Sequence, residues 1–338
     1  MAGEEPGPDC NPEPPQNTPF PLCAAKDYAK KANSMKILFS AFAGYALLVA
    51  PLARAGTEVD DKTAVASTQT TDEAVQLDLF KIEQGYVFES DLNHGGSLGK
   101  QDELHSEIEY AHRIQLRGNT YLRLGFSYER FDFGSTNAPV PNHLQALAGV
   151  VGIDFMHGKD VGAFIEFRPG FYTQNDFGIS SFDVPIILSR IFVLEQDRLY
   201  LFTGVYTSFL KGGNPVLPLL GVIWIPNDKL RLMGVLPEPK LIYSATDKLN
   251  LWVGGQLVGG SFRTDPNDDI RPKKLNGTQV DFSDYRAGVG LTYKLTKNAR
   301  LDFAAGYSVQ RHFAFHRAGE NYRTDPSPYV RLQLNAAF

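Results

Sequence analysis

The sequence predicts an all-β protein, an antiparallel transmembrane β-barrel of about fourteen strands. Three observations predict it: segments that alternate strictly between apolar and polar residues, connections that alternate between short and long, and an apolar C-terminal strand. Alternation with a period of two is typical of a strand whose two faces meet different surroundings. The last ten residues, YVRLQLNAAF, alternate in this way and end on Phe338. An open sheet would leave that strand as an exposed edge, so we predict that it pairs with the first strand and closes a barrel.

Residues 1–34 form a proline-rich, low-complexity extension that holds both cysteines of the chain, Cys10 and Cys23. A segment of this composition has too little apolar surface to form a core. We hypothesise that translation starts at Met35 and that the extension is a consequence of a wrongly chosen start site. A long but genuine leader is the alternative, and in both cases the segment is absent from the mature protein.

Residues 35–55 have the three parts of a secretory signal peptide in the required order. Lys36 follows the methionine, residues 37–50 carry no charge, and Ala53 and Ala55 give the small-x-small pattern read by signal peptidase, which leaves Gly56 as the first mature residue. A membrane anchor is the competing interpretation. It needs about 20 apolar residues to cross the hydrocarbon core, and this segment is shorter.

The mature chain would begin with a polar periplasmic leader, residues 56–74, followed by the barrel, residues 75–338. Residues 1–55 carry five basic and five acidic side chains, so the mature part keeps the net charge of −5. This mild acidity argues against a nucleic-acid partner, which requires a basic surface. The mature part has no cysteine and no apolar run long enough for a transmembrane helix.

Four segments in the barrel region, 103–117, 119–133, 284–294 and 300–310, carry apolar residues at every second position and charged or small residues between them. They are ten residues or longer, whereas strands of globular sheets usually have about 5–6 residues. Length near 9–11 with one apolar face is the mark of a membrane-spanning strand. A secreted β-sandwich would also alternate, but with shorter strands.

Short polar connections at 117–119, 157–160, 195–197, 226–228, 246–248 and 296–298 alternate with generally longer ones at 90–102, 134–142, 174–181, 264–278 and 314–327. In outer-membrane barrels the short turns face the periplasm and the long loops face outside. The pattern therefore predicts fourteen strands with both termini periplasmic. Twelve is the alternative, because segments 216–225, 229–236 and 240–245 are rich in proline and alternate poorly.

Residues 227–263, NDKLRLMGVLPEPKLIYSATDKLNLWVGGQLVGGSFR, combine a short turn, a Pro-Glu-Pro reversal and a glycine-rich strand. This run resembles a signature of a Gram-negative outer-membrane β-barrel family of unknown function. The apolar series at the C-terminus also resembles the signal read by the barrel assembly machinery, and it comprises Val330, Leu332, Leu334, Ala336 and Phe338. These resemblances imply a location in the bacterial outer membrane, with lipid, lipopolysaccharide and the assembly machinery as partners. They imply no catalytic residues.

The polar faces of the predicted strands would line the barrel interior. The charged candidates are Glu107, Glu109, Arg113, Arg117, Arg123, Glu129, Glu166, Arg168, Asp284, Arg286, Arg300 and Asp302. A barrel of this size has room for a narrow polar passage, whose charges would select solutes. Equally, charges confined in a small interior need partners and can pair across it until they fill it. Both interpretations stay open.

The sequence favours a narrow, porin-like channel for small solutes, with a closed barrel of structural, anchoring or adhesive role as the alternative. An outer-membrane hydrolase is less favoured. His94 and Ser97 share a glycine-rich loop without an orienting third group. His312 and His316 would lie about 13 Å apart on a strand, too far to bind one ion. Asp265, Asp268 and Asp269 lack EF-hand spacing. We therefore expect no enzymatic activity, no cofactor and no metal. The oligomeric state is not predicted.

Overall fold

The computed structural model describes residues 75–157, 160–268 and 270–338. The predicted extension, signal peptide and leader, together with the cleavage residues Ala53, Ala55 and Gly56, lie outside the described residues.

The described chain is almost entirely β-structure, with two short 3-10 turns, η1 (Ile179–Ser181) and η2 (Lys273–Leu275). The strands are β1 (Asp78–Asn93), β2 (Ser97–Arg117), β3 (Thr120–Phe133), β4 (His143–His157), β5 (Asp160–Phe167), β6 (Gly170–Thr173), β7 (Phe182–Asp183), β8 (Ile186–Glu195), β9 (Leu199–Thr207), β10 (Val216–Asn227), β11 (Leu230–Gly234), β12 (Lys240–Ser244), β13 (Leu249–Arg263), β14 (Gln279–Lys294), β15 (Ala299–Phe315), β16 (Glu320–Thr324) and β17 (Ser327–Ala337).

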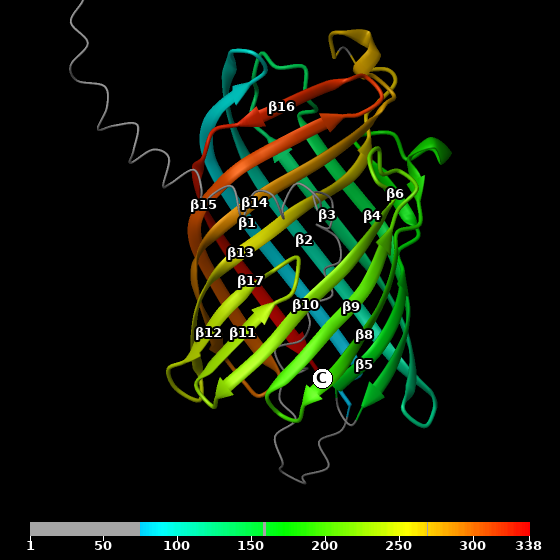
Figure 1. The fold of residues 1–338 in the computed structure, drawn as a ribbon. Coiled ribbons are helices and arrows are strands. Elements are labelled where there is room, and N and C mark those ends of the chain that lie inside the picture. Colours follow the sequence, from blue (N-terminus) through cyan, green and yellow to red (C-terminus); the bar gives the residue numbers. More distant parts are fainter. Residues whose placement is uncertain (1–74, 158–159, 269) are drawn as a thin grey trace, which may run out of the picture. The chain divides into compact units, whose positions relative to one another are not determined.

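Fourteen of these strands pair antiparallel in one closed circuit, β1–β2–β3–β4–β5–β8–β9–β10–β11–β12–β13–β14–β15–β17 and back to β1 (Figure 1). The closing pair runs from Leu79 opposite Ala337 to Val87 opposite Tyr329. The prediction of a closed barrel with fourteen strands is confirmed, and the proline-rich segments form β10, β11 and β12. Three short strands lie beside the circuit: β6 pairs with β4, β7 with β6, and β16 with both β15 and β1.

The alternation of the sequence becomes an alternation of exposure along the strands. In β17, Arg331 and Gln333 are buried whereas Val330 and Leu332 are exposed. Since the strands enclose an interior, the buried face points inward and the apolar face points outward. A barrel wall with an apolar outer face suits a lipid environment.

The two ends of the barrel differ in their connections. The backbone N–H of Leu77 donates to the carbonyl of Phe338 over 2.6 Å, so the first and last described segments meet at the end with the short turns, where the C-terminus lies in Figure 1. The opposite end carries the loops 134–142, 174–181, 208–215 and 264–278, and the β15–β16 hairpin. The prediction of a loop at 90–102 is largely wrong, because β1 continues to Asn93 and β2 begins at Ser97.

Within the part of the chain that the structure describes, we find no helix of the length and apolarity needed to cross a membrane.

Candidate functional site: the barrel interior

Ion pairs cross the interior between strands that are not neighbours in the wall. Arg286 of β14 donates from Nη2 to Glu103 of β2 over 2.9 Å, and both side chains are completely buried. Arg286 also pairs with Asp284 on its own strand. Gly85 of β1 makes room for this guanidinium, because a Cβ there would lie 3.2 Å from Arg286 Nη1. The contact is therefore a bridge through the barrel rather than part of the sheet.

A second bridge fixes the β11–β12 turn, residues 235–239, against the interior. Arg331 of β17 donates to Glu238 of this turn over 3.0 Å, and it also pairs with Asp302 of β15. Lys240 lies 2.6 Å from the other carboxylate oxygen of Glu238. The Glu238 carboxylate thus links the turn to a strand that is not its neighbour in the wall, since β13, β14 and β15 lie between β12 and β17.

A third group of charges spans β2 to β5. Asp154 of β4 accepts from Arg113 Nε over 2.8 Å and lies 3.3 Å from Arg123. Arg123 donates to Glu166 of β5 over 2.7 Å. Glu166 in turn pairs with Arg168, whose Nη1 donates to Glu109 of β2 over 2.9 Å. Because each carboxylate in this chain of contacts has a guanidinium partner, burial leaves no net charge uncompensated here.

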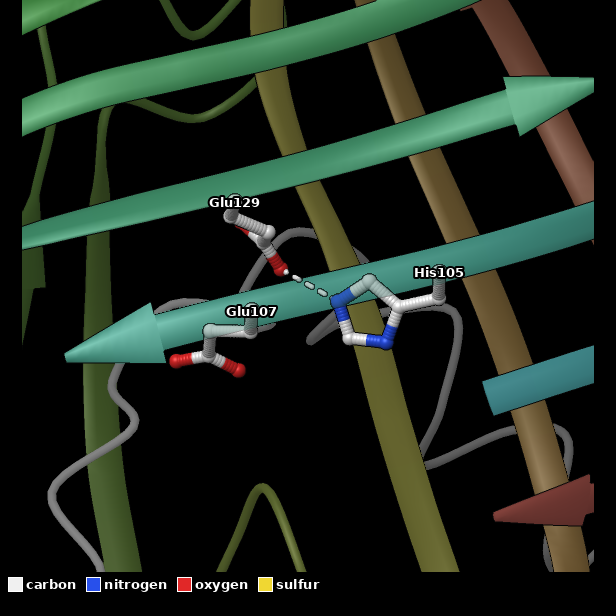
Figure 2. Close-up of side chains that lie close together, drawn as sticks. All are labelled: His105, Glu107 and Glu129. Carbon is white, nitrogen blue, oxygen red and sulfur yellow. Dashed lines mark hydrogen bonds and ion pairs between the residues drawn. The ribbon is translucent and has the colours of Figure 1, made fainter. Parts of the chain in front are cut away.

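His105, Glu107 and Glu129 form the titratable cluster that Figure 2 shows between β2 and β3. His105 Nε2 lies 3.1 Å from Glu129 Oε1, and His105 Nδ1 lies 3.4 Å from Glu83. Lys81 donates to Glu107 over 3.1 Å. The His105 ring stacks on Phe131 at a centroid distance of 4.6 Å.

The cluster borders a cavity of about 40 Å³. A water molecule needs roughly 10–15 Å³ of such space, so the cavity can hold two or three. Its lining comes from β1, β2 and β3, from Arg168, from the β11–β12 turn and from β13, and comprises Lys81, His105, Glu107, Ser127, Glu129, Arg168, Pro237, Glu238, Gln256, Leu257 and Val258. Polar groups from both sides of the interior therefore converge on one cavity that is large enough for water.

The imidazole and two carboxylates of this cluster lie within 4.8 Å of one another, close enough to bind one divalent cation. Each of them already has another partner, however. The Lys81 ammonium neutralises Glu107, and His105 contacts both Glu83 and Glu129. The arrangement is satisfied as an ion-pair network without a cation.

A second part of the interior is apolar. On β8, β9 and β10 most inward side chains are hydrophobic, and most outward ones are too, although Ser189 of β8 is inward and Arg190 is outward. On β10, Leu217 and Leu219 are 3% and 5% exposed, whereas Leu220 is 62% exposed. The inward residues form one buried cluster, which we call the apolar compartment: Phe164, Ile187, Tyr200, Phe202, Tyr206, Leu217, Leu219, Ile223, Val235 and Leu257. The expectation that charges line the interior therefore does not hold for these strands.

The loop end of the interior is filled by a second apolar cluster, which we call the plug. Its centre is an aromatic stack in which Phe282 lies 5.0 Å from Phe131, 5.0 Å from Phe133 and 4.9 Å from Phe313, measured between ring centroids. Leu275 of the 264–278 loop is also fully buried in it. The plug adjoins the cavity, because Val258 belongs to the plug and also lines the cavity.

Comparisons with known proteins give a likeness of fold only. No protein-family model matches the chain, and no curated protein sequence does. An outer-membrane channel from Pseudomonas putida F1 is 12% identical, with 81% of this chain and 100% of that chain covered and a TM-score of 0.42. The toluene transporter TodX of Pseudomonas putida is 9% identical, with 82% and 94% covered and a TM-score of 0.38. The translocator domain of the autotransporter NalP from Neisseria meningitidis is 11% identical, with 93% and 100% covered and a TM-score of 0.36.

The structure brings most of the charged candidates together inside the barrel. Glu107 and Glu109 are partly buried and paired, and Arg117 is exposed beside the turn at Gly118, at the rim of the barrel. Arg300 is partly exposed near the same end. The buried members are Arg113, Arg123, Glu129, Glu166, Arg168, Asp284, Arg286 and Asp302.

Sequence reasoning missed several residues of the interior network. Glu83 and Lys81 belong to β1, whose two faces were not assigned from the sequence, and Glu103, His105 and Arg331 lie on polar faces without being selected. Their position on the same face as the chosen charges is the signal that could have found them. Glu238 gives no such signal, because it lies in a turn.

Proposed function

We propose that this chain is an outer-membrane β-barrel that admits small solutes through a narrow interior. The observation that carries the proposal is the polar cavity inside the barrel, lined by charged groups from both sides of the interior. A barrel needed only as a scaffold can be filled with apolar side chains at less cost, because every buried charge must be desolvated. Ion pairs around water instead provide polar partners for a passing solute.

The remaining features fit the same setting. The apolar outer face suits lipid and lipopolysaccharide, and the apolar series ending at Phe338 suits delivery by the barrel assembly machinery. The short turns and both termini of the barrel segment would then face the periplasm. The predicted signal peptide would direct the chain out of the cytoplasm. We propose no enzymatic activity, because no nucleophile, base and orienting group come together among the described residues.

A closed barrel with a structural, anchoring or adhesive role is the second candidate. The bridges Arg286–Glu103 and Arg331–Glu238 and the aromatic plug favour it, since they fill the interior. Such a protein would act through its loops and would pass no solute.

Conductance of the purified mature chain in a planar lipid bilayer separates the two. We expect discrete openings of small amplitude, and flux of small sugars or amino acids into protein-containing vesicles. A bilayer that stays silent at several voltages, together with vesicles that are no more permeable than protein-free ones, would overturn the channel in favour of the closed barrel.

A further inference from the structure

The charged groups around the cavity are balanced. Its lining contains as many carboxylates as basic side chains: Glu107, Glu129 and Glu238 against Lys81, His105 and Arg168. A cleft that attracts ions is lined mainly by charges of one sign. This cavity has no such bias, so its lining does not favour a solute of either charge.

Each of these charges already has an ion-pair partner in the barrel. Two of the pairs lie within the lining, both with a nitrogen–oxygen distance of 3.1 Å: Lys81 with Glu107, and His105 with Glu129. Arg168 and Glu238 pair with side chains outside the lining. An ion that entered the cavity and bound one of these groups would have to separate a pair, which is costly because it leaves a buried charge without its partner.

The lining also offers atoms that are not used by the barrel itself. Among its buried atoms without a hydrogen-bond partner in the described residues are Nη2 of Arg168, which is a donor, and Oε1 of Gln256, which is an acceptor. Buried polar atoms in proteins nearly always have a partner, so such atoms beside a cavity indicate water or a bound molecule. A molecule that satisfies both atoms must accept one hydrogen bond and donate another.

The paired carboxylates keep capacity for further hydrogen bonds. A carboxylate has roughly four acceptor positions on its two oxygens, and an ion pair occupies only part of them. The Glu238 carboxylate illustrates this, because it accepts from Gln256 Nε2 over 2.9 Å while it also pairs with Arg331 and Lys240. A hydroxyl group can therefore donate to a lining carboxylate and accept from Arg168 while the ion pairs stay intact.

Part of the lining is apolar, which narrows the class of solute further. Pro237 of the β11–β12 turn and Leu257 and Val258 of β13 add carbon surface to the same cavity of about 40 Å³. Space for two or three water molecules admits only a small molecule. The combination suits a compound that presents C–H groups on one side and hydroxyl groups on the other.

We propose that the cavity is the selectivity site of the barrel and that it favours small uncharged polyols, such as glycerol, over ions of similar size. The proposal rests on the proposed function and names its solute class. A polyol replaces the hydrogen bonds of the cavity waters with those of its own hydroxyl groups, whereas an ion must break an ion pair of the lining. The small amplitude expected for the channel openings follows, because ions carry the current.

The test measures tracer exchange in lipid vesicles that contain the purified chain. Three radiolabelled probes of similar size are compared at equal concentration on both sides of the membrane: glycerol, which is neutral, lactate, which is an anion, and ethanolammonium, which is a cation. The cavity variant is Gln256→Glu, which is nearly isosteric and adds a carboxylate beside Glu238. The matched control is Gln196→Glu in the exposed turn between β8 and β9. Ratios of exchange rates within one vesicle preparation do not depend on the amount of folded protein.

After subtraction of the rates in protein-free vesicles, we expect glycerol to exchange at least about tenfold faster than either ion, since each ion must separate a buried pair. Gln256→Glu should lower the ratio of glycerol to ethanolammonium by about threefold or more, because the added carboxylate offers the cation a partner, and Gln196→Glu should leave the ratio unchanged. If Gln256→Glu lacks the mobility of a folded barrel on unboiled gels, Gln256→Leu takes its place, and loss of the acceptor should slow glycerol by about threefold.

The outcomes separate this inference from the channel itself. An ion that exchanges as fast as glycerol, or an equal effect of the cavity variant and the control variant, overturns the solute class alone. Exchange of all three probes no faster than in protein-free vesicles overturns the proposed function as well.

Discussion

Arg286 and Glu103 are 183 positions apart in the sequence, and their side chains meet inside the barrel with a nitrogen–oxygen distance of 2.9 Å. Neither side chain is exposed, and the two strands that carry them are not neighbours. The pair ties β14 to β2 along the inner face of β17 and β1, so it couples the stability of the barrel to the contacts inside it.

Replacement of the Arg286 side chain should lower the stability of the barrel. Arg286→Met leaves Glu103 and Asp284 buried without their shared partner, and loss of one member of a buried pair typically destabilises by about 3–5 kcal/mol. Urea unfolding in detergent micelles, followed by tryptophan fluorescence, measures this loss in the free energy of unfolding. Arg130→Met is the control, because the Arg130–Asp132 pair is more than one-third exposed on average and should contribute at most about 1 kcal/mol. Equal effects of the two variants would contradict the structural role of the bridge.

The aromatic plug makes a separate prediction for Phe282. Phe282→Ala removes three ring contacts and should destabilise the barrel by about 3–5 kcal/mol, the usual cost of deleting a buried aromatic side chain. Because the resulting space lies between the cavity and the loop end, we also expect larger single-channel conductance. Phe303→Ala on the outward face of β15 is the control. Unchanged conductance in a folded Phe282→Ala barrel would show that the plug does not limit the passage.

Lys211, in the loop 208–215, gives a prediction about pH. Burial lowers the pKa of Lys211 to about 8, against a smaller opposing effect of Asp281. The folded state therefore disfavours the charged form, and the unfolded chain binds more protons between about pH 8 and the ordinary lysine value. Stability of the native protein should rise with pH in this window. Lys211→Met should be more stable at pH 7, with the difference shrinking above pH 8 in unfolding experiments. A difference that does not depend on pH would contradict this account.

The C-terminal residue should matter for assembly more than for stability. Phe338 is 63% exposed at the end of the apolar series. We expect deletion of Phe338 to reduce the amount of folded protein in the outer membrane several-fold, whereas Phe338→Tyr keeps the aromatic ring and should preserve it. Gel mobility of unboiled membrane fractions reports the folded amount. Normal levels of the deletion variant would exclude a role in targeting.

Cleavage after Ala55 can be read directly from the native protein. The signal-peptide prediction requires Gly56 as the first mature residue, and Ala55→Arg should block processing because signal peptidase accepts only small residues there. Mass spectrometry of the purified protein gives the mature N-terminus. A mature chain that still contains Cys10 or Cys23 would refute both the signal peptide and the proposed start at Met35.

The sequence predicted those strands well whose two faces meet opposite environments. Away from the plug, the outward residues of β2, β3, β14, β15 and β17 are mostly apolar and the inward ones mostly polar or small, so the period of two is plain. In β8, IILSRIFVLE, inward Ile187 and outward Leu188 are both apolar. Because apolar residues occupy both faces of this strand, the sequence does not show which face points inward. The apolar compartment could therefore not be recognised from the sequence.

The contacts across the interior could not be predicted for another reason. The polar faces indicate that Arg286 and Glu103 point inward, but their meeting depends on the strand register and the diameter of the closed barrel. The His105–Glu129 contact likewise follows from the β2–β3 register, which sets His105 opposite Phe131. The short extent of β11 and β12 was likewise not predictable, because proline-rich composition does not determine where a strand ends.

The pairing of β1 with β17 has a practical consequence for engineering. Since the amide of Leu77 and the carbonyl of Phe338 are already hydrogen-bonded, a short linker can join these two positions and make the wall covalently continuous. A cut in the 264–278 loop would then create new ends, because loops far from paired backbone tolerate such breaks. The circularly permuted protein would keep every strand pair and carry both of its termini on the opposite side, ready to receive a fused tag or reporter.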